Sequence, residues 1–147
     1  MPPLTELIEL IERYPGGVDG VHELPIPRVK LFRSSTPTEP LHALHEPSIC
    51  LVVQGRKQVR IGDQTLVYDS GRFLAASVDV PVVGHVIEAS KEAPYLCFKL
   101  TIERTMLAAL ALEMGPAEVE DVAPGVALSP MTPELLDAAS RLLRLAD

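Results

Sequence analysis

Histidine and carboxylate side chains gather in one short stretch of the sequence, where His42, His45 and Glu46 lie close together and His85 follows later. Imidazole and carboxylate groups that converge on one cation, with a coordination position left open, support metal-dependent chemistry. A histidine in a loop beside prolines is, however, more often exposed to solvent than bound to a metal. Because no nucleophile–base pair is recognisable by spacing either, the sequence predicts no metal, no cofactor and no enzymatic activity.

Polar residues on predicted strands suggest a different chemistry, the binding of a small molecule. They are Arg33, Tyr68, His85, Tyr95 and Lys99. In a β-barrel, inward residues alternate with outward ones, and a few inward polar groups orient a ligand among apolar walls. His85 is the first choice, because its neighbour Gly84 could mark a bulge or a close backbone approach. A structural role stays open for each: a tyrosine can belong to the core, and the lysine and arginine can lie on a solvated face.

The last predicted strand, residues 94–100, has two different faces, and the sequence leaves open which of them is inside. Successive side chains of a strand alternate. Tyr95, Cys97 and Lys99 therefore share one face, while Leu96, Phe98 and Leu100 share the other. If the leucine and phenylalanine face points inward, the barrel is filled with side chains and binds nothing.

Two further features are expected to be structural. The motif Gln54-Gly55-Arg56-Lys57 places adjacent positive charges beside a glycine; it could gate an anion or ligand, but we expect a hairpin with a solvated tip. Cys50 and Cys97 lie within apolar runs, where a free thiol behaves as a small hydrophobic group. We therefore expect both cysteines to be buried and reduced in a cytoplasmic protein.

These residues must be positioned by strands. Apolar residues at helical spacing predict an amphipathic helix over residues 3–14, which ends at Pro15-Gly16-Gly17. Residues 18–47 are rich in proline, which removes backbone donors, and predict an edge strand or two with irregular connections. Short β runs then alternate with turn signals such as Gly62-Asp63, which predicts antiparallel sheets. The predicted strands are 48–54, 57–61, 64–69, 72–78, 82–90 and 94–100.

The segment over residues 101–147 is predicted to be helical. One helix begins at residue 101 or 102 and ends at 114, and a second begins at Thr132-Pro133-Glu134, where the threonine can cap it. The second helix carries an apolar stripe, formed by Leu135, Leu136, Ala139, Leu142 and Leu143. Because the first helix could already cover the barrel, we expect part of this stripe to face a second copy of the chain in a homodimer.

Length and composition set the class of protein. With 147 residues the chain is expected to form one domain with one core, as a barrel over about residues 18–100 followed by the helical segment. A net charge of −7 argues against a DNA-binding surface, which needs clustered Lys and Arg. No apolar run approaches the roughly 20 residues of a membrane span, so we expect no contact with a membrane and a cytoplasmic location.

Several short motifs follow one another in an order that points to a family. They are Gln54-Gly55-Arg56-Lys57, Gly62-Asp63, Tyr68-Asp69, Val78-Asp79-Val80-Pro81, Glu88-Ala89-Ser90 and Pro94-Tyr95-Leu96. With these motifs the chain resembles the N-terminal domain of a subgroup of AraC-type transcriptional regulators. The resemblance implies a cupin-like β-barrel, helices that pair two subunits, and a small-molecule effector. It also implies a C-terminal helix-turn-helix module that binds DNA, which we expect to be absent from this chain.

Two alternatives to a ligand-sensing, dimerising regulatory domain are kept. A cupin barrel can be a metal-dependent enzyme, such as a dioxygenase or isomerase. The usual cupin ligand motif, anchored on Gly55, would place its ligands at His42, Leu44 and Ser48, so only one of three ligand types is retained. The third possibility is a barrel that binds no ligand and serves only as an oligomerising scaffold.

Overall fold

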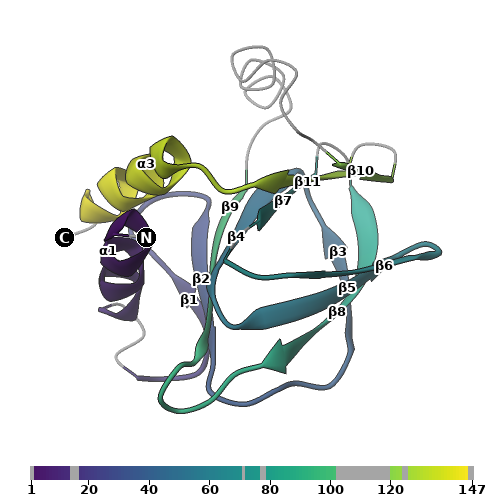
Figure 1. The fold of residues 1–147 in the computed structure, drawn as a ribbon, viewed down its shortest axis with the longest axis horizontal. Helices are drawn as coiled ribbons and strands as arrows, with labels where there is room; N and C mark the ends of the chain where they lie inside the picture. Colours follow the sequence, from purple (N-terminus) through teal and green to yellow (C-terminus); the bar gives the residue numbers. More distant parts are fainter. Residues whose placement is uncertain are drawn as a thin grey trace.

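The part of the chain that the structure describes forms two antiparallel β-sheets that face each other, with two helices outside one of them (Figure 1). This computed structural model describes residues 2–13, 17–70, 72–76, 79–101, 120–123 and 126–145. Within these ranges, the large sheet has the order β1 (Gly20–Glu23), β2 (Val29–Ser34), β9 (Tyr95–Thr101), β4 (Ser48–Gln54), β7 (Arg72–Ala76), β11 (Val126–Pro130) and β10 (Glu120–Ala123). The small sheet has the order β3 (Leu41–His45), β8 (Val80–Glu88), β5 (Arg56–Ile61) and β6 (Gln64–Tyr68).

The prediction of a mainly β, cupin-like architecture with antiparallel strands is confirmed. Each strand predicted between residues 48 and 100 is present, with ends that differ by at most a few residues. The predicted hairpin turn joins β5 to β6, and Gly62 there has a φ of 59°. Glycine adopts this left-handed conformation without the strain that a Cβ would add.

The segments before and after the central strands differ from the prediction. Residues 18–47 form three regular strands, β1 to β3, although an edge strand or two was predicted. The segment over residues 101–147 is not helical throughout, because β10 and β11 form a hairpin and β11 pairs with β7. The predicted helix over residues 102–114 lies outside the described residues. A strand at residues 126–130 gains a complete ladder of backbone hydrogen bonds from β7, which local sequence pattern does not reveal.

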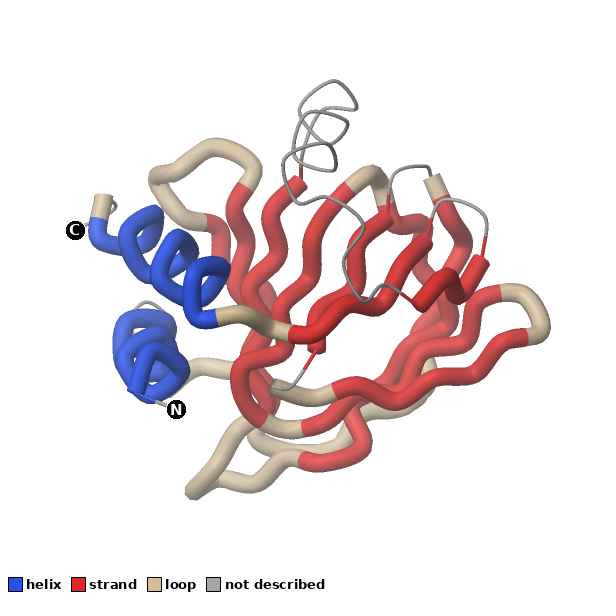
Figure 2. The backbone as a smooth tube through the Cα atoms, turned by 45° about the horizontal axis from the view of Figure 1, so that its top comes forward, coloured by secondary structure: helices blue, strands red, loops and turns tan. Residues whose placement is uncertain are grey.

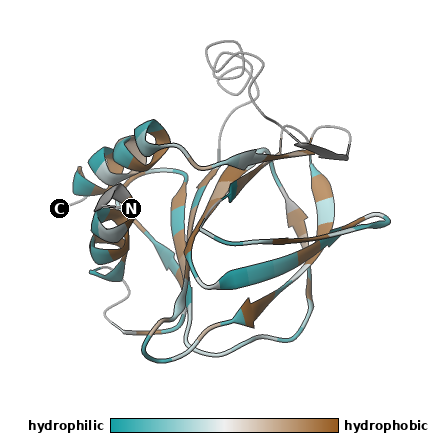
Figure 3. Ribbon diagram, viewed as in Figure 1, coloured by the Kyte–Doolittle hydropathy of each residue, from teal (hydrophilic) through white to brown (hydrophobic). Residues whose placement is uncertain are grey.

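Two helices, α1 (Pro2–Glu12) and α3 (Pro133–Arg144), lie side by side against the outer face of the large sheet (Figures 1 and 2). Thr132 caps α3 as predicted, since its Oγ1 accepts a hydrogen bond from the Leu135 backbone N–H at 3.1 Å. Arg144 forms an ion pair with Glu6 that joins the two helices. Hydrophobic and hydrophilic residues alternate around both helices (Figure 3), as expected for helices with one buried face.

The apolar stripe of α3 is mostly used within its own chain. Leu136, Ala139 and Leu143 are buried in a cluster with residues of α1 and the outer face of the large sheet. Leu135 and Leu142 are partly buried against the same cluster. The contact of part of this stripe with a second copy stays a prediction: three of its five members are covered within the chain, and the partly buried Leu135 and Leu142 are left for such a contact.

The core has two layers, one on each face of the large sheet. The outer cluster joins the helices to Leu31, Leu51 and Phe98. The inner cluster lies between the two sheets and includes Cys97, Val59 and Val86. None of the described helices is long and apolar enough to cross a membrane.

Candidate ligand-binding site

A cavity of about 490 Å³ lies between the two sheets. Apolar side chains of the large sheet (Phe32 and Tyr95) and of the small sheet (Val82 and Val86) form much of its wall. Lys57 on β5 adds a charged group. The barrel interior is therefore not filled by its own side chains, and the remaining space is within the range of pockets that hold small molecules.

The face of β9 that the sequence left open is settled by the two core clusters. Tyr95 and Cys97 belong to the inner cluster, whereas Leu96 and Phe98 pack in the outer cluster beneath α1 and α3. Large apolar side chains on this side of the strand meet the helices, so the more polar side is left for the interior. This arrangement is the one that allows a cavity.

Edge strands border the cavity on one side. β1 ends the large sheet and β3 ends the small sheet, and Val21 and Leu41 on these two strands line the cavity. Both side chains are nonetheless exposed, Val21 at 58% and Leu41 at 72%. Residues that line a cavity and still contact solvent mark its mouth, which lies between these two edges.

Lys57 lines the cavity, although the sequence predicts a solvated turn for its motif. On β5 it alternates with Val59 and Ile61, which are buried in the inner cluster, so its side chain points into the barrel rather than into solvent. A Cβ added to Gly84 would lie 3.1 Å from Lys57 Cε and 3.8 Å from its Nζ. Gly84 is thus explained by the close approach of this lysine side chain. The alternation Lys57, Val59, Ile61 was the signal that could have identified it.

The neighbouring Arg56 is exposed as predicted, but the motif is not a hairpin, because β4 and β5 belong to different sheets. Its guanidinium lies 3.5 Å from the Glu88 carboxylate and 4.0 Å from that of Asp69. A second hollow of about 400 Å³ is found here, bordered by both carboxylates and by Gly55. Gly55 has a φ of 85°, and a Cβ there would lie 2.7 Å from the Glu88 carbonyl oxygen. The glycine is therefore required by the turn.

Two tyrosines and two thiols form a buried polar group in the interior. Burial raises the pKa of Tyr68 and of Tyr95 well above the ordinary value. Burial also raises the pKa of Cys50, and that of Cys97 to about 12, while the charges of Lys57 and Lys99 act in the opposite direction on both thiols. All four groups are therefore neutral near pH 7, as expected for the cysteines, and the Tyr68 hydroxyl has no hydrogen-bond partner among the described residues.

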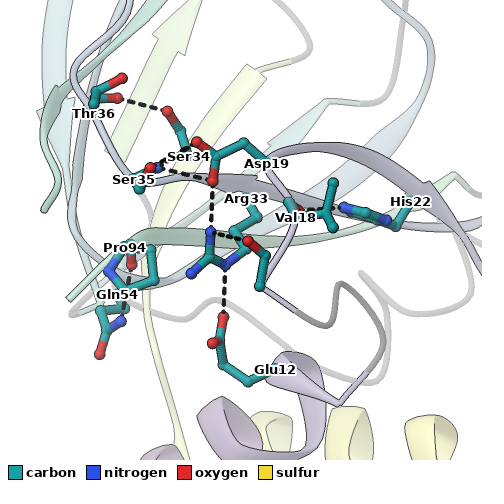
Figure 4. Close-up of polar contacts among 11 residues, drawn as sticks. Glu12, Val18, Asp19, His22, Arg33, Ser34, Ser35, Thr36, Gln54 and Pro94 are labelled. Atoms are coloured by element: carbon teal, nitrogen blue, oxygen red, sulfur yellow. Dashed lines mark hydrogen bonds and ion pairs between the residues drawn. The ribbon is translucent and has the colours of Figure 1, made fainter. Parts of the chain in front are cut away.

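Arg33 borders the cavity, but its guanidinium forms hydrogen bonds with other residues of the chain (Figure 4). Its Nη1 donates to Asp19 Oδ1 at 2.6 Å and to the Gly17 carbonyl oxygen at 3.2 Å. Its Nε donates to Glu12 Oε1 at 3.2 Å. Asp19 also accepts hydrogen bonds from the Ser35 backbone N–H and hydroxyl, which lower its pKa. The side chain thus joins α1 to the rim of the cavity.

The other predicted ligand residues divide between the cavity and its surroundings. Tyr95 lines the cavity, and Tyr68 is buried in the inner cluster without being part of the wall. Lys99 lies on the inner face of β9, away from the cavity wall. His85 is among the lining residues, although strand alternation puts its side chain on the face opposite to Gly84 and Val86. Of the predicted residues, Arg33, His85 and Tyr95 thus line the cavity, together with Lys57.

The three positions of the cupin ligand motif do not come together in the structure. His42 and Leu44 share the exposed outer face of β3, while Ser48 is buried on the inner face of β4, in the other sheet. Among the side chains that the structure describes, no three His, Cys, Asp or Glu residues approach one another closely enough to hold a metal ion.

Comparisons with solved structures find distant similarities. Among solved structures, it is similar to an apo ToxT variant from Vibrio cholerae strain SCE256, with 7% identity and a TM-score of 0.49, over 85% of this chain and 50% of that chain. It is also similar to a cupin-2 domain containing protein from Shewanella frigidimarina NCIMB 400, with 15% identity and a TM-score of 0.34, over 56% of this chain and 80% of that one. The chain thus spans half the length of the ToxT structure. A comparison with curated proteins finds no match.

The family comparison is specific and covers most of the sequence. Residues 25–147 match the family described as AraC-type transcriptional regulator N-terminus. The matched range begins just before β2 and includes every described strand from β2 onward and α3. This chain belongs to the family of AraC-type transcriptional regulator N-terminal domains.

Proposed function

We propose that this chain is the ligand-sensing domain of a cytoplasmic transcriptional regulator, whose cavity takes up a small-molecule effector. The observation that carries the proposal is the cavity of about 490 Å³ between the sheets, with apolar walls and one inward lysine. A few polar groups among apolar walls are typical of small-molecule sites. The effector enters between β1 and β3, where Val21 and Leu41 are exposed.

The bound effector acts on a DNA-binding module through the helices. Asp19 and Val21 belong to the cavity wall, and Arg33 joins Asp19 to Glu12 at the end of α1. α1 in turn packs on α3, which follows the barrel in the chain. An effector that shifts the rim at β1 therefore changes the position of α1 and α3. This chain of contacts supports a route from the cavity to the C-terminal side of the domain.

Self-association is part of the proposal, although the buried members of the α3 stripe do not contribute to it. The half-buried Leu135 and Leu142 and the exposed Leu145 are the apolar residues of this region that another copy can still contact. A symmetric contact would use each of them twice. Sedimentation velocity at tens of micromolar protein tests it: a dimer that Leu145→Glu dissociates supports the proposal, and a monomeric wild-type chain contradicts it.

A regulatory rather than an enzymatic role is proposed for the site. The neutral thiols and tyrosines of the interior are poor nucleophiles, because their pKa values are raised by burial. The positions that would carry cupin ligands are divided between opposite faces of the two sheets. These observations support binding without a chemical reaction.

Blocking the cavity tests whether it is a ligand site. The probe is phenylnaphthylamine, a neutral aromatic molecule whose fluorescence rises in apolar surroundings. Ala43 lines the cavity from β3, and the adjacent Leu44 is 64% exposed on the opposite face. We expect Ala43→Phe to weaken binding of the probe about tenfold or more, and Leu44→Phe to leave it unchanged. Equal binding by wild type and both variants would contradict the proposal.

A further inference from the structure

We infer that the effector is an organic anion, a molecule with an apolar body and a negatively charged group that Lys57 Nζ binds from within the barrel. This inference rests on the proposed function and specifies the class of molecule that the cavity accepts. Its basis is the position of Lys57, which lines the cavity beside Gly84.

No described carboxylate forms an ion pair with Lys57. Its neighbour Arg56 forms ion pairs with the carboxylates of Glu88 and Asp69 on the outside of the barrel. A half-buried ammonium group without a partner loses hydration that nothing replaces, and an incoming anion would compensate for that loss with a charge-assisted hydrogen bond.

The carboxylates at the cavity rim do not compete for this lysine. Asp19 is held by Arg33 and by the backbone and hydroxyl of Ser35. Glu39 also lines the cavity, but it is exposed and forms no ion pair with Lys57. The ammonium group inside the barrel thus stays available to a ligand.

A cationic side chain, Lys57, faces the barrel interior in a chain whose net charge is −7. Lys99 lies on the same inner surface, and the charges of Lys57 and Lys99 both reach the thiols of Cys50 and Cys97. Tyr95 at the cavity wall stays protonated, so it adds no negative charge that would repel an anion. Lys57 therefore offers an anion a positive charge in the interior, while the two carboxylates of the cavity wall, Asp19 and Glu39, lie at its rim.

The apolar part of the ligand follows from the rest of the wall. Phe32, Val82 and Val86 offer no polar side-chain atom to a ligand. A small inorganic anion would leave these side chains uncovered and most of the cavity empty. The geometry favours a molecule that fills the space with hydrocarbon or aromatic groups and places its charge at Lys57.

Two probes that differ only in charge test the inference on the wild-type chain. Anilinonaphthalenesulfonate is an anion, and phenylnaphthylamine has the same ring system without the sulfonate. Lys57→Met removes the inward charge, while Arg60→Met removes the same charge from the exposed face of β5. We expect Lys57→Met to weaken binding of the sulfonate at least about tenfold, which corresponds to about 1.4 kcal/mol, and to change the affinity for phenylnaphthylamine less than threefold.

The control variant separates a local effect from a change in total charge. Arg60→Met should leave both affinities unchanged, and Lys57→Gln provides a second, polar variant should Lys57→Met fold poorly. If both probes are weakened equally by Lys57→Met and Lys57→Gln, or the sulfonate is weakened equally by Arg60→Met, the inference is wrong. If phenylnaphthylamine binds in an Ala43→Phe-sensitive manner throughout, the proposed function stands even when the inference fails.

Discussion

Arg33 and Asp19 form the shortest of the charged contacts around the cavity rim, with 2.6 Å between Nη1 and Oδ1. The same guanidinium contacts Glu12 at the end of α1, and the Arg33 side chain is only 10% exposed. One side chain therefore connects the segment before β1, a strand of the large sheet and the helical layer. The sequence makes Arg33 a candidate for ligand binding; in the structure it lines the cavity, and its guanidinium contacts Asp19 and Glu12.

Removal of Arg33 should destabilise the chain. We expect Arg33→Met to lower the free energy of unfolding by about 2 kcal/mol, because two carboxylates lose a charge-assisted partner that is itself largely buried. Arg60→Met, at an exposed position, should change it by less than about 0.5 kcal/mol. Urea denaturation followed by circular dichroism measures both. Equal stability of the two variants would show that the Arg33 contacts contribute nothing.

Acid should weaken the same rim. The pKa of Asp19 lies below its ordinary value of 3.8, chiefly because Ser35 donates hydrogen bonds to the carboxylate. A carboxyl group whose pKa is lower in the folded state stabilises the fold above its unfolded pKa, and the contribution is lost as the pH falls through the folded pKa. We therefore expect the stability difference between wild type and Asp19→Asn to shrink below pH 4. A difference that stays constant from pH 6 to pH 3 would contradict this assignment.

The two cysteines should resist alkylation. The thiolate is the reactive form, and burial raises the pKa of Cys97 to about 12 and that of Cys50 as well. At pH 8 iodoacetamide should leave both thiols of the folded chain unmodified for hours, and should modify both in urea. Since the unfolded thiols ionise near pH 9, their contribution to stability should be lost as the pH rises from about 9 toward 12. Rapid labelling of the folded chain, read by mass spectrometry, would overturn this account.

The packing of α3 can be tested with two leucines that are close in sequence. Leu143 is fully buried, whereas Leu145 is 77% exposed. We expect Leu143→Ala to cost about 3 kcal/mol of unfolding free energy through lost contacts and a new cavity, and Leu145→Ala to cost less than about 0.5 kcal/mol. Chemical denaturation of both variants gives the comparison. Similar values for the two would place α3 away from the sheet.

Much of the fold could be predicted from local patterns. The strands between residues 48 and 100 have alternating or fully apolar runs bounded by turn residues, and Gly62 marks a hairpin whose conformation favours glycine. β10 and β11 were not predicted, because their pairing with β7 is a contact between distant segments. Propensity alone describes such short strands poorly.

The site was predictable only in part. Tyr95 was identified because it lies on a strand with one polar face, but the inner face became known only when the helices were seen to cover Leu96 and Phe98. The stripe on α3 showed that the helix has a buried side, not which surface covers it. Because Lys57 follows Gly55, the sequence predicts a solvated turn residue at this position. Its alternation with Val59 instead places its side chain inside the barrel.

A crystal structure of the chain grown with anilinonaphthalenesulfonate examines the cavity itself. The expected result is one probe molecule between the two sheets, with its rings against Phe32 and Val86 and its sulfonate about 3 Å from Lys57 Nζ. The contrary result is a barrel interior closed by its own side chains, or a probe found only on the outer surface. Either would mean that this domain does not take up a ligand between its sheets.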